Sequence, residues 1–256
     1  MYNVIGDVAG NFLTLKALIE KMPKDSTIIC LGDPNDRGPR SKQVIEYLMD
    51  NKILINSNHA HMLVEEFIPT GYYEKDLWVN WNGGDRTLES YETDWKTNRI
   101  KYYPHGYGYD LTGIIPQSHI DFLKNSPLYM LTDDYLFSHA PINQNDTIEE
   151  ASDIGLGFEN GDIHKSDKSF LWNRYIPDKP NTNLNGKINV FGHMASDHVK
   201  VYNSQYRQGI KVCDNEQMDS LKNSDIFGIC LDTSSRKVLT GMHFPSMMIY
   251  EQEWID

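Results

Sequence analysis

Short apolar runs recur along the chain, and a polar residue of a metal-binding type follows each of them. The runs and the residues after them are 2–5 before Asp7, 27–31 before Asp33, 53–55 before Asn58 and His59, 135–137 before His139, and 188–191 before His193. Each run is rich in β-branched or aromatic residues and too short for a helix, which predicts a buried strand. Open α/β sheets bind ligands beyond the carboxyl ends of such strands, so we expect these polar side chains to share one site.

Two stretches between the early strands have the three- and four-residue spacing of an amphipathic helix. Their apolar positions are Phe12, Leu15, Leu18, Ile19 and Met22 in the first, and Val44, Ile45, Leu48 and Met49 in the second. Pro23 is expected to end the first helix. Later in the chain, 227–231 and 238–242 alternate like the two strands of a closing hairpin, with 233–236 as its turn.

Two polar segments interrupt this pattern, one near 85–117 and one near 203–225. We expect both to be insertions in a single domain spanning 1–256, since the chain has no internal repeat and no low-complexity linker. Strands alternate with helices early in the chain and strands dominate its second half. The pattern therefore predicts an α/β protein.

Composition narrows the class of protein further. The chain has 256 residues, 39% hydrophobic and 23% charged, as expected of a folded domain with a sizeable core. It has no apolar run of about 18 residues and no signal-peptide pattern at its start, so we expect no membrane partner. Three cysteines at no metal-ligand spacing favour a reducing, cytoplasmic location. The net charge of −12, without a basic stripe, disfavours passive binding to a phosphate backbone, so we expect no nucleic-acid duplex as partner. The oligomeric state stays open.

Nine polar residues make up the candidate site: Asp7, Asp33, Asp36, Arg37, Asn58, His59, His139, Arg174 and His193. Asp, Asn and His offer oxygen and nitrogen ligands that suit Mn, Fe or Zn. A bridging carboxylate with terminal ligands on both sides can hold two cations about 3.5–4 Å apart. A histidine outside the metal shells can protonate a leaving oxygen, and arginines can bind phosphate oxygens in fork geometry.

The ordered motifs resemble those of the PPP-type serine/threonine phosphatases in the calcineurin-like metallophosphoesterase superfamily. The matching segments are Gly6-Asp7-Val8-Ala9-Gly10-Asn11, Gly32-Asp33-Pro34-Asn35-Asp36-Arg37-Gly38, Ser57-Asn58-His59-Ala60, Phe137-Ser138-His139-Ala140, Trp172-Asn173-Arg174, Phe191-Gly192-His193 and Leu231-Asp232-Thr233. The tract Trp81-Asn82-Gly83-Gly84, followed by Thr87, Leu88, Ser90 and Tyr91, is similar to the bacterial and bacteriophage lambda-type branch. Order and spacing match over nearly the whole chain outside the two insertions.

The resemblance implies a four-layer fold, in which two packed β-sheets are flanked by helices, and two divalent metal ions. Mn is the expected metal, with Fe, Zn or Ni as alternatives. By position, Asp7 would bind the first metal and Asp33 would bridge both, while the second metal would be bound by Asn58, His139 and His193. The resemblance also implies that His59 is the general acid held by Asp36, and that Arg37 and Arg174 contact the phosphate.

Two motif positions depart from the family pattern. Ala9 stands where the family has a histidine ligand, and Ala60 stands where an acidic residue follows the catalytic histidine. A methyl group coordinates nothing, so we expect a weakened first metal site and impaired activity. Ser57 in place of glycine is a milder change. Both losses are to alanine in otherwise intact motifs, which fits either deliberate inactivation or natural drift.

The resemblance implies hydrolysis of a phosphomonoester, on a phosphoprotein or a small molecule, by metal-activated water. Two alternatives remain from the sequence. One is a nucleotide phosphodiesterase, or a hydrolase of dinucleoside polyphosphates or cyclic nucleotides, since such enzymes share these motifs. The other is a catalytically silent protein that binds phosphate through Arg37, Arg174 and one metal.

Overall fold

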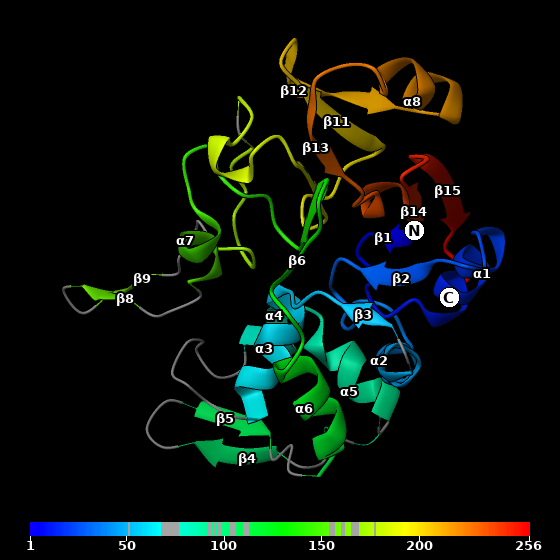
Figure 1. Cartoon of the computed structure of the whole chain (residues 1–256). Helices are drawn as coiled ribbons and strands as arrows, with labels where there is room; N and C mark the ends of the chain where they lie inside the picture. Colours follow the sequence, from blue (N-terminus) through cyan, green and yellow to red (C-terminus); the bar gives the residue numbers. More distant parts are fainter. Residues whose placement is uncertain are drawn as a thin grey trace.

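Two β-sheets pack face to face and form the centre of the molecule (Figure 1). The computed structural model describes residues 1–50, 52–67, 77–91, 94, 96, 99–102, 106–109, 113–153, 157–159, 162–164, 169–176 and 178–256. The mixed α/β architecture predicted from the sequence, two sheets flanked by helices, is confirmed.

The first sheet has five strands in the order β15-β14-β1-β2-β3. Its strands are β1 (Tyr2–Ile5), β2 (Thr27–Cys30), β3 (Ile53–Leu54), β14 (Val238–Phe244) and β15 (Met248–Glu253). β1, β2 and β3 are parallel, and β14 and β15 add antiparallel strands beside β1. The three N-terminal strands therefore end at one edge.

The second sheet has six strands in the order β12-β11-β13-β10-β7-β6. Its strands are β6 (Tyr129–Leu131), β7 (Tyr135–Ser138), β10 (Ile188–Phe191), β11 (Val199–Asn203), β12 (Tyr206–Val212) and β13 (Ile226–Cys230). β7, β10 and β13 are parallel. The second sheet thus repeats the arrangement of three parallel strands found in the first.

Alternation along the strands builds the core from both sheets. Val4 and Ile29 face the second sheet, where they join Phe137 and Val190 in a buried cluster. Their neighbours Ile5 and Cys30 face the opposite side and pack against helices. Most of the fully buried side chains on these strands are β-branched or aliphatic, with exceptions such as Cys30 and Phe137, as is typical of parallel strands covered on both faces.

Helices cover the outer face of the first sheet: α1 (Phe12–Lys21), α2 (Ser41–Met49), α3 (Asn58–Phe67) and α6 (Gln117–Lys124). Two shorter helices, α4 (Leu77–Trp81) and α5 (Gly84–Tyr91), lie next to them. The outer face of the second sheet has a thinner cover, made by α7 (Ile148–Ser152), a 3-10 turn at Thr182–Leu184 and the loop around Phe170 and Ile176.

The two polar segments contain regular structure where they are described. The segment 85–117 holds most of α5 and a ribbon of β4 (Arg99–Tyr102) and β5 (Gly106–Tyr109), while other parts of it lie outside the described residues. The segment 203–225 holds β12, which extends the second sheet, and α8 (Asn215–Leu221). A further ribbon pairs β8 (Gly157–Glu159) with β9 (Asp162–His164).

The predicted closing hairpin is wrong. β13 belongs to the second sheet and β14 to the first, and a 3-10 turn at Ser234–Arg236 carries the chain across. The hairpin instead joins β14 to β15. β13 and β14 both line the core between the sheets, so apolar residues recur along them as they would in the two strands of a hairpin.

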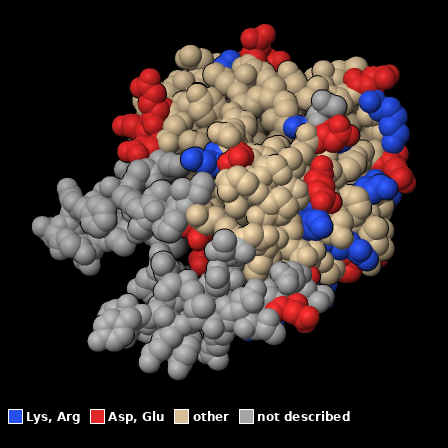
Figure 2. Space-filling model, turned by 90° about the horizontal axis from the view of Figure 1, so that it is seen from below, with Lys and Arg blue, Asp and Glu red and all other residues tan. Residues whose placement is uncertain are grey.

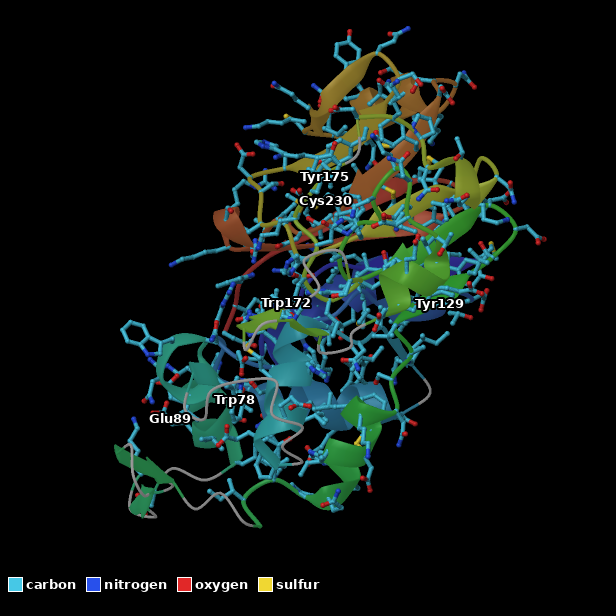
Figure 3. The ribbon with its side chains drawn as sticks, turned by 90° about the vertical axis from the view of Figure 1, so that its left-hand side faces the viewer. Trp78, Glu89, Tyr129, Trp172, Tyr175 and Cys230 are labelled. Carbon is cyan, nitrogen blue, oxygen red and sulfur yellow. The ribbon has the colours of Figure 1, made fainter. Side chains whose placement is uncertain are left out.

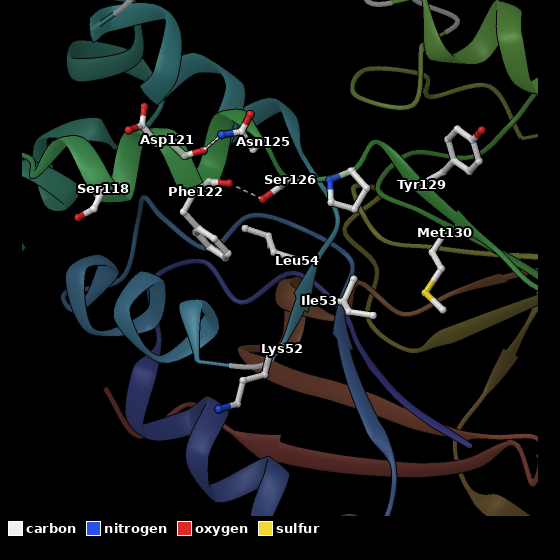
Figure 4. A pocket seen from close by; sticks show the side chains of 11 residues that line it. Lys52, Ile53, Leu54, Ser118, Asp121, Phe122, Asn125, Ser126, Tyr129 and Met130 are labelled. Carbon is white, nitrogen blue, oxygen red and sulfur yellow. Dashed lines mark hydrogen bonds between the residues drawn. The ribbon is translucent and has the colours of Figure 1, made fainter.

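An open apolar groove of about 600 Å³ lies between α6, β3 and β6 (Figure 4). Its lining includes Ile53, Phe122 and Met130, and none of the nine candidate residues. Among the described helices, none has the length and apolar character needed to cross a membrane.

Candidate active site

Six parallel strands, three from each sheet, deliver one polar residue each to the same edge of the sandwich. The residues from the first sheet are Asp7, Asp33 and Asn58, and those from the second are His139, His193 and Asp232. The backbone N–H of His193 donates to both oxygens of Asp7, at 3.2 and 3.0 Å, so the two sets meet. Five of the six were predicted as metal ligands, whereas Asp232 was not.

Asp7, Asp33 and His139 form the tightest group, with one potential ligand atom of each within 4.8 Å of the others. His139 Nε2 lies 3.6 Å from Asp33 Oδ1 and 2.8 Å from Asn58 Oδ1. The other ring nitrogen, Nδ1, lies 3.0 Å from the carbonyl oxygen of Leu31. That contact orients the ring so that Nε2 faces the carboxylates, as in metal-binding histidines. All three residues are buried.

Among the residues at the six strand ends, two buried polar atoms make no hydrogen bond within the described part of the chain: Asp33 Oδ1 and His193 Nε2. Each residue is 6% exposed. Buried carboxylate oxygens and ring nitrogens are rarely left without a partner, because desolvation without a compensating contact is costly. Oxygen and imidazole nitrogen together suit a divalent cation such as Mn or Zn. The residues present therefore fit a metal ion.

Charges within the group affect its protonation. Burial by itself raises the pKa of Asp33, but the nearby imidazoles of His59 and His139 outweigh burial and lower it. Burial also lowers the pKa of His193, and His139 and Arg174 add to that effect. An ionised carboxylate and a neutral imidazole are the forms that bind metal.

His59 and Asp36 form the predicted pair. His59 Nδ1 lies 2.6 Å from Asp36 Oδ2, and Nε2 lies 3.8 Å from Asp33 Oδ2 and 3.4 Å from Arg37 Nη2. Burial lowers the pKa of His59, but the carboxylates of Asp33 and Asp36 more than offset that effect and raise it. The contact that we expected between His59 and Asp36 is present, with Nε2 left to face the site.

Two residues that the sequence did not assign hold Asp36 in place. Trp78 Nε1 donates to both Asp36 oxygens at 2.9 and 3.0 Å, and Thr87 Oγ1 donates to Oδ1 at 2.7 Å. Trp78 lies among the helices beneath the two sheets (Figure 3). Asp36 has no exposed surface. Thr87 belongs to the tract that follows Trp81-Asn82-Gly83-Gly84, which resembled a family segment but was given no role, and Trp78 lies before that tract.

The backbone is unusual at the site. Of eight non-glycine residues with positive φ in the described part of the chain, five are here: Ala9, Asp33, Asp36, Arg37 and His193. L residues seldom adopt this region, and such residues concentrate at functional sites. Gly192 must be glycine, because a Cβ there would lie 2.1 Å from Asp7 Oδ1.

Arg37 and Arg174 are exposed at the site, and no carboxylate among the described residues pairs with either. Arg174 lies close enough to His139 and His193 to influence their pKa values. Their guanidinium groups thus keep donors for an anion.

Ala9 and Ala60 lie where the motifs placed them. Ala9 is 4% exposed with φ of 49°, and its N–H donates to the Asp33 carbonyl at 2.6 Å. Ala60 is fully buried in the first turn of α3. Ser57 Oγ accepts from the N–H groups of Asp33 at 2.8 Å and Ala60 at 3.3 Å. Ser57 therefore caps α3 and fixes the Asp33 backbone, a role that the sequence analysis did not predict.

Asp232 is 3% exposed, and its Oδ1 accepts the N–H of Ser234 at 3.1 Å. Burial raises the pKa of Asp7, and repulsion from Asp232 and Asp33 raises it further. Asp232 belongs to the Leu231-Asp232-Thr233 segment, which was noted in the sequence but given no role.

Comparison with solved structures shows which fold the chain has. A putative diadenosine tetraphosphatase matches with a TM-score of 0.56 and 16% identity, covering 100% of this chain and 94% of that one. A metallophosphoesterase from Sphaerobacter thermophilus matches with a TM-score of 0.57 and 12% identity, covering 98% and 87%. The chain has the metallophosphoesterase fold.

A protein serine/threonine phosphatase from Saccharomyces cerevisiae shares this metallophosphoesterase fold, with a TM-score of 0.51, 13% identity and coverage of 100% and 80%. No family model matches the sequence, and neither does any curated protein compared with it. At these identities the likeness concerns the fold.

Proposed function

We propose that this protein is a metal-dependent phosphoesterase that hydrolyses a phosphomonoester, on a phosphoprotein or a small molecule. The observation that carries this proposal is that two groups of side chains meet where the parallel strands end. One is the group Asp7, Asp33 and His139, together with the unpartnered buried atoms Asp33 Oδ1 and His193 Nε2, and the other is His59 held by Asp36. Metal ligands beside an oriented proton donor suit phosphoryl transfer to water.

The metal ions would be held by Asp7 and Asp33 at the first position, and by Asp33, Asn58, His139 and His193 at the second. When bound, two divalent cations, with Mn expected and Fe, Zn or Ni as alternatives, would neutralise phosphoryl charge and lower the pKa of a water molecule. The first position has fewer protein ligands because Ala9 offers none. We therefore propose that activity is impaired in this chain.

The remaining residues would bind phosphate, orient the His59 imidazole and donate a proton. Arg37 and Arg174 would bind phosphate oxygens through planar donors that no described carboxylate occupies. His59 would give the proton on Nε2 to the leaving oxygen, because its Nδ1 is engaged by Asp36. Trp78 and Thr87 keep the Asp36 carboxylate from rotating, so the imidazole stays aimed at the site.

A nucleotide substrate is the second candidate. The putative diadenosine tetraphosphatase resembles this chain over the full length of one and 94% of the other, which supports the dinucleoside polyphosphate alternative at the level of fold. The Trp81-Asn82-Gly83-Gly84 tract supports instead the bacterial and lambda-type phosphatase branch.

We propose one domain spanning 1–256 and a cytoplasmic location. We propose a phosphorylated partner and not a nucleic-acid duplex. On the face seen in Figure 2, acidic and basic side chains are interspersed, and the basic ones form no continuous stripe for a duplex.

The test is a substrate panel assayed with Mn²⁺ on the chain as it stands and on the double variant Ala9→His, Ala60→Glu. The panel contains an aryl phosphate, phosphopeptides, dinucleoside polyphosphates and cyclic nucleotides. The proposal predicts highest kcat/KM on a phosphomonoester and a large gain in the double variant. Preference for dinucleoside polyphosphates would favour the second candidate. Phosphate binding without turnover in both proteins would leave a silent phosphate-binding protein.

A further inference from the structure

The six strand ends at the site are arranged in two facing rows of three. In the first sheet the order is β1, β2, β3, and in the second it is β13, β10, β7. β1 and β13 lie at corresponding ends of these rows, because a Cβ on Gly6 would be 2.4 Å from the Leu231 carbonyl oxygen and 3.4 Å from the Asp232 nitrogen. At the other end, His139 after β7 lies beside Asn58 after β3. Asp232 is therefore at the Asp7 end of the site.

Asp232 is a buried carboxylate, 3% exposed, that accepts hydrogen bonds from the backbone N–H and the side chain of Ser234. Asp7 and Asp33, also buried, lie close enough to repel it, and the exposed Arg37 offsets part of that repulsion. Three buried carboxylates in mutual repulsion are unfavourable unless a cation or a proton compensates them.

An independent observation indicates a cation rather than a proton. Asp33 Oδ1 and His193 Nε2 are buried and make no hydrogen bond within the described residues. His193 follows β10, the strand beside β13, and its backbone N–H contacts Asp7. An imidazole nitrogen and a carboxylate oxygen that are both buried without a partner form a donor set that suits a divalent cation.

The Asp7 end is also where the chain lacks an imidazole, since Ala9 replaces the expected histidine. We propose that Asp232 supplies the negative charge that holds a cation at the Asp7 end of the site, in place of the ligand missing at position 9. This inference rests on the proposed metal-dependent function. It assigns to Asp232 a part in cation binding that goes beyond the five predicted ligands.

The test uses the metal-free full-length protein and Mn²⁺ binding followed by calorimetry, so that no activity is needed. Asp232→Asn keeps an oxygen that can accept from the Ser234 N–H but removes the charge. Asp225→Asn is the matched control, because Asp225 also accepts a hydrogen bond from a serine, Ser204, but is exposed and precedes β13, at the opposite end of that strand from Asp232. A third variant combines Asp232→Asn with Ala9→His.

We expect two binding events in the unmodified chain, with the weaker one lost or reduced about 10- to 100-fold in affinity by Asp232→Asn, the usual effect of removing a residue that supports metal ligands. Asp225→Asn should change neither event. In the Ala9→His background the effect of Asp232→Asn should shrink, because a restored imidazole binds the same cation.

Thermal unfolding separates this role from a structural one. Without metal, Asp232→Asn should unfold at the same or a higher temperature, since it removes repulsion, while its gain in melting temperature on adding Mn²⁺ should be smaller. An unchanged weaker event, or a lower melting temperature in the absence of metal with both events equally weakened, would overturn the inference. If the unmodified chain binds no Mn²⁺ at all, the proposed function fails as well.

Discussion

At the scale of single residues, Ala9 combines two disadvantages. Its φ of 49° lies in the left-handed region, where an L residue costs about 1–2 kcal/mol, and its methyl group offers no ligand to the group around Asp7. Histidine is found in this region more often than alanine, and glycine adopts it freely. The backbone at position 9 is thus shaped for another residue.

This feature allows a prediction with an internal control. Ala9→His should raise kcat by more than about 100-fold with a smaller change in substrate Kd, because one well-placed electrostatic group is worth about that much in the transition state. Ala9→Gly should stabilise the fold by about 0.4–1 kcal/mol without raising kcat. Steady-state kinetics and chemical denaturation measure the two effects. An Ala9→His variant that gains affinity and no rate would show that position 9 is not a missing metal ligand.

The pair of His59 and Asp36 gives a second prediction. In the Ala9→His background, Asp36→Asn should lower kcat by about 10²–10⁴-fold, the range for general acid catalysis, since the amide cannot accept the Nδ1–H in the same way. The loss should be smaller for aryl phosphates with good leaving groups, which need little protonation. Equal losses on poor and good leaving groups would mean that the pair serves another purpose.

At the scale of elements, α4 and α5 hold the Asp36 carboxylate. Trp78→Phe keeps the aromatic ring and removes the N–H, so it should destabilise the fold by about 1–3 kcal/mol and lower kcat, because a buried carboxylate loses a donor. Trp81→Phe is the matched control, since Trp81 is on the same helix but 82% exposed, and it should leave stability unchanged. Urea denaturation of both variants checks the difference. Equal effects would contradict this account of α4.

Some elements were predictable and others were not, for physical reasons. β1 and β10 were predicted with their observed bounds, because β-branched runs ending in Gly-Asp or Gly-His mark both the strand and its end. The sequence of a strand does not show which other strands pair with it in a sheet. β13 and β14 therefore looked like a hairpin, although they belong to different sheets.

The residues of the candidate site were likewise predicted only in part. Residues within motifs were predicted and the structure brings them together, because their spacing from strand ends is local. The sequence predicted no role for Trp78 and Thr87, since their contact with Asp36 joins positions 42 and 51 residues apart. It predicted none for Asp232, because the place of Asp232 in the site depends on β13 lying opposite β1.

At the scale of the whole molecule, the charge of the buried site links metal binding to stability. Mn²⁺ should raise the melting temperature of metal-free protein, with about 2.7 kcal/mol of stabilisation at 100 times the Kd. Asp33→Asn should abolish most of this gain, because Asp33 faces both proposed positions. Differential scanning fluorimetry with Mn²⁺, and with chelator added back, measures it. Identical melting temperatures with and without Mn²⁺ would count against a metal centre.

The six polar strand ends come from two sheets whose shared core is largely apolar, although Thr233 and Thr240 are hydrogen-bonded between them at 2.7 Å. Apolar surfaces can slide a little at low cost, because their attraction has no direction. Cations held by donors from both sheets would act as a cross-link, fixing the register of one sheet on the other. Hydrogen exchange in β1 and β13, far apart in the chain, should then slow together when metal binds.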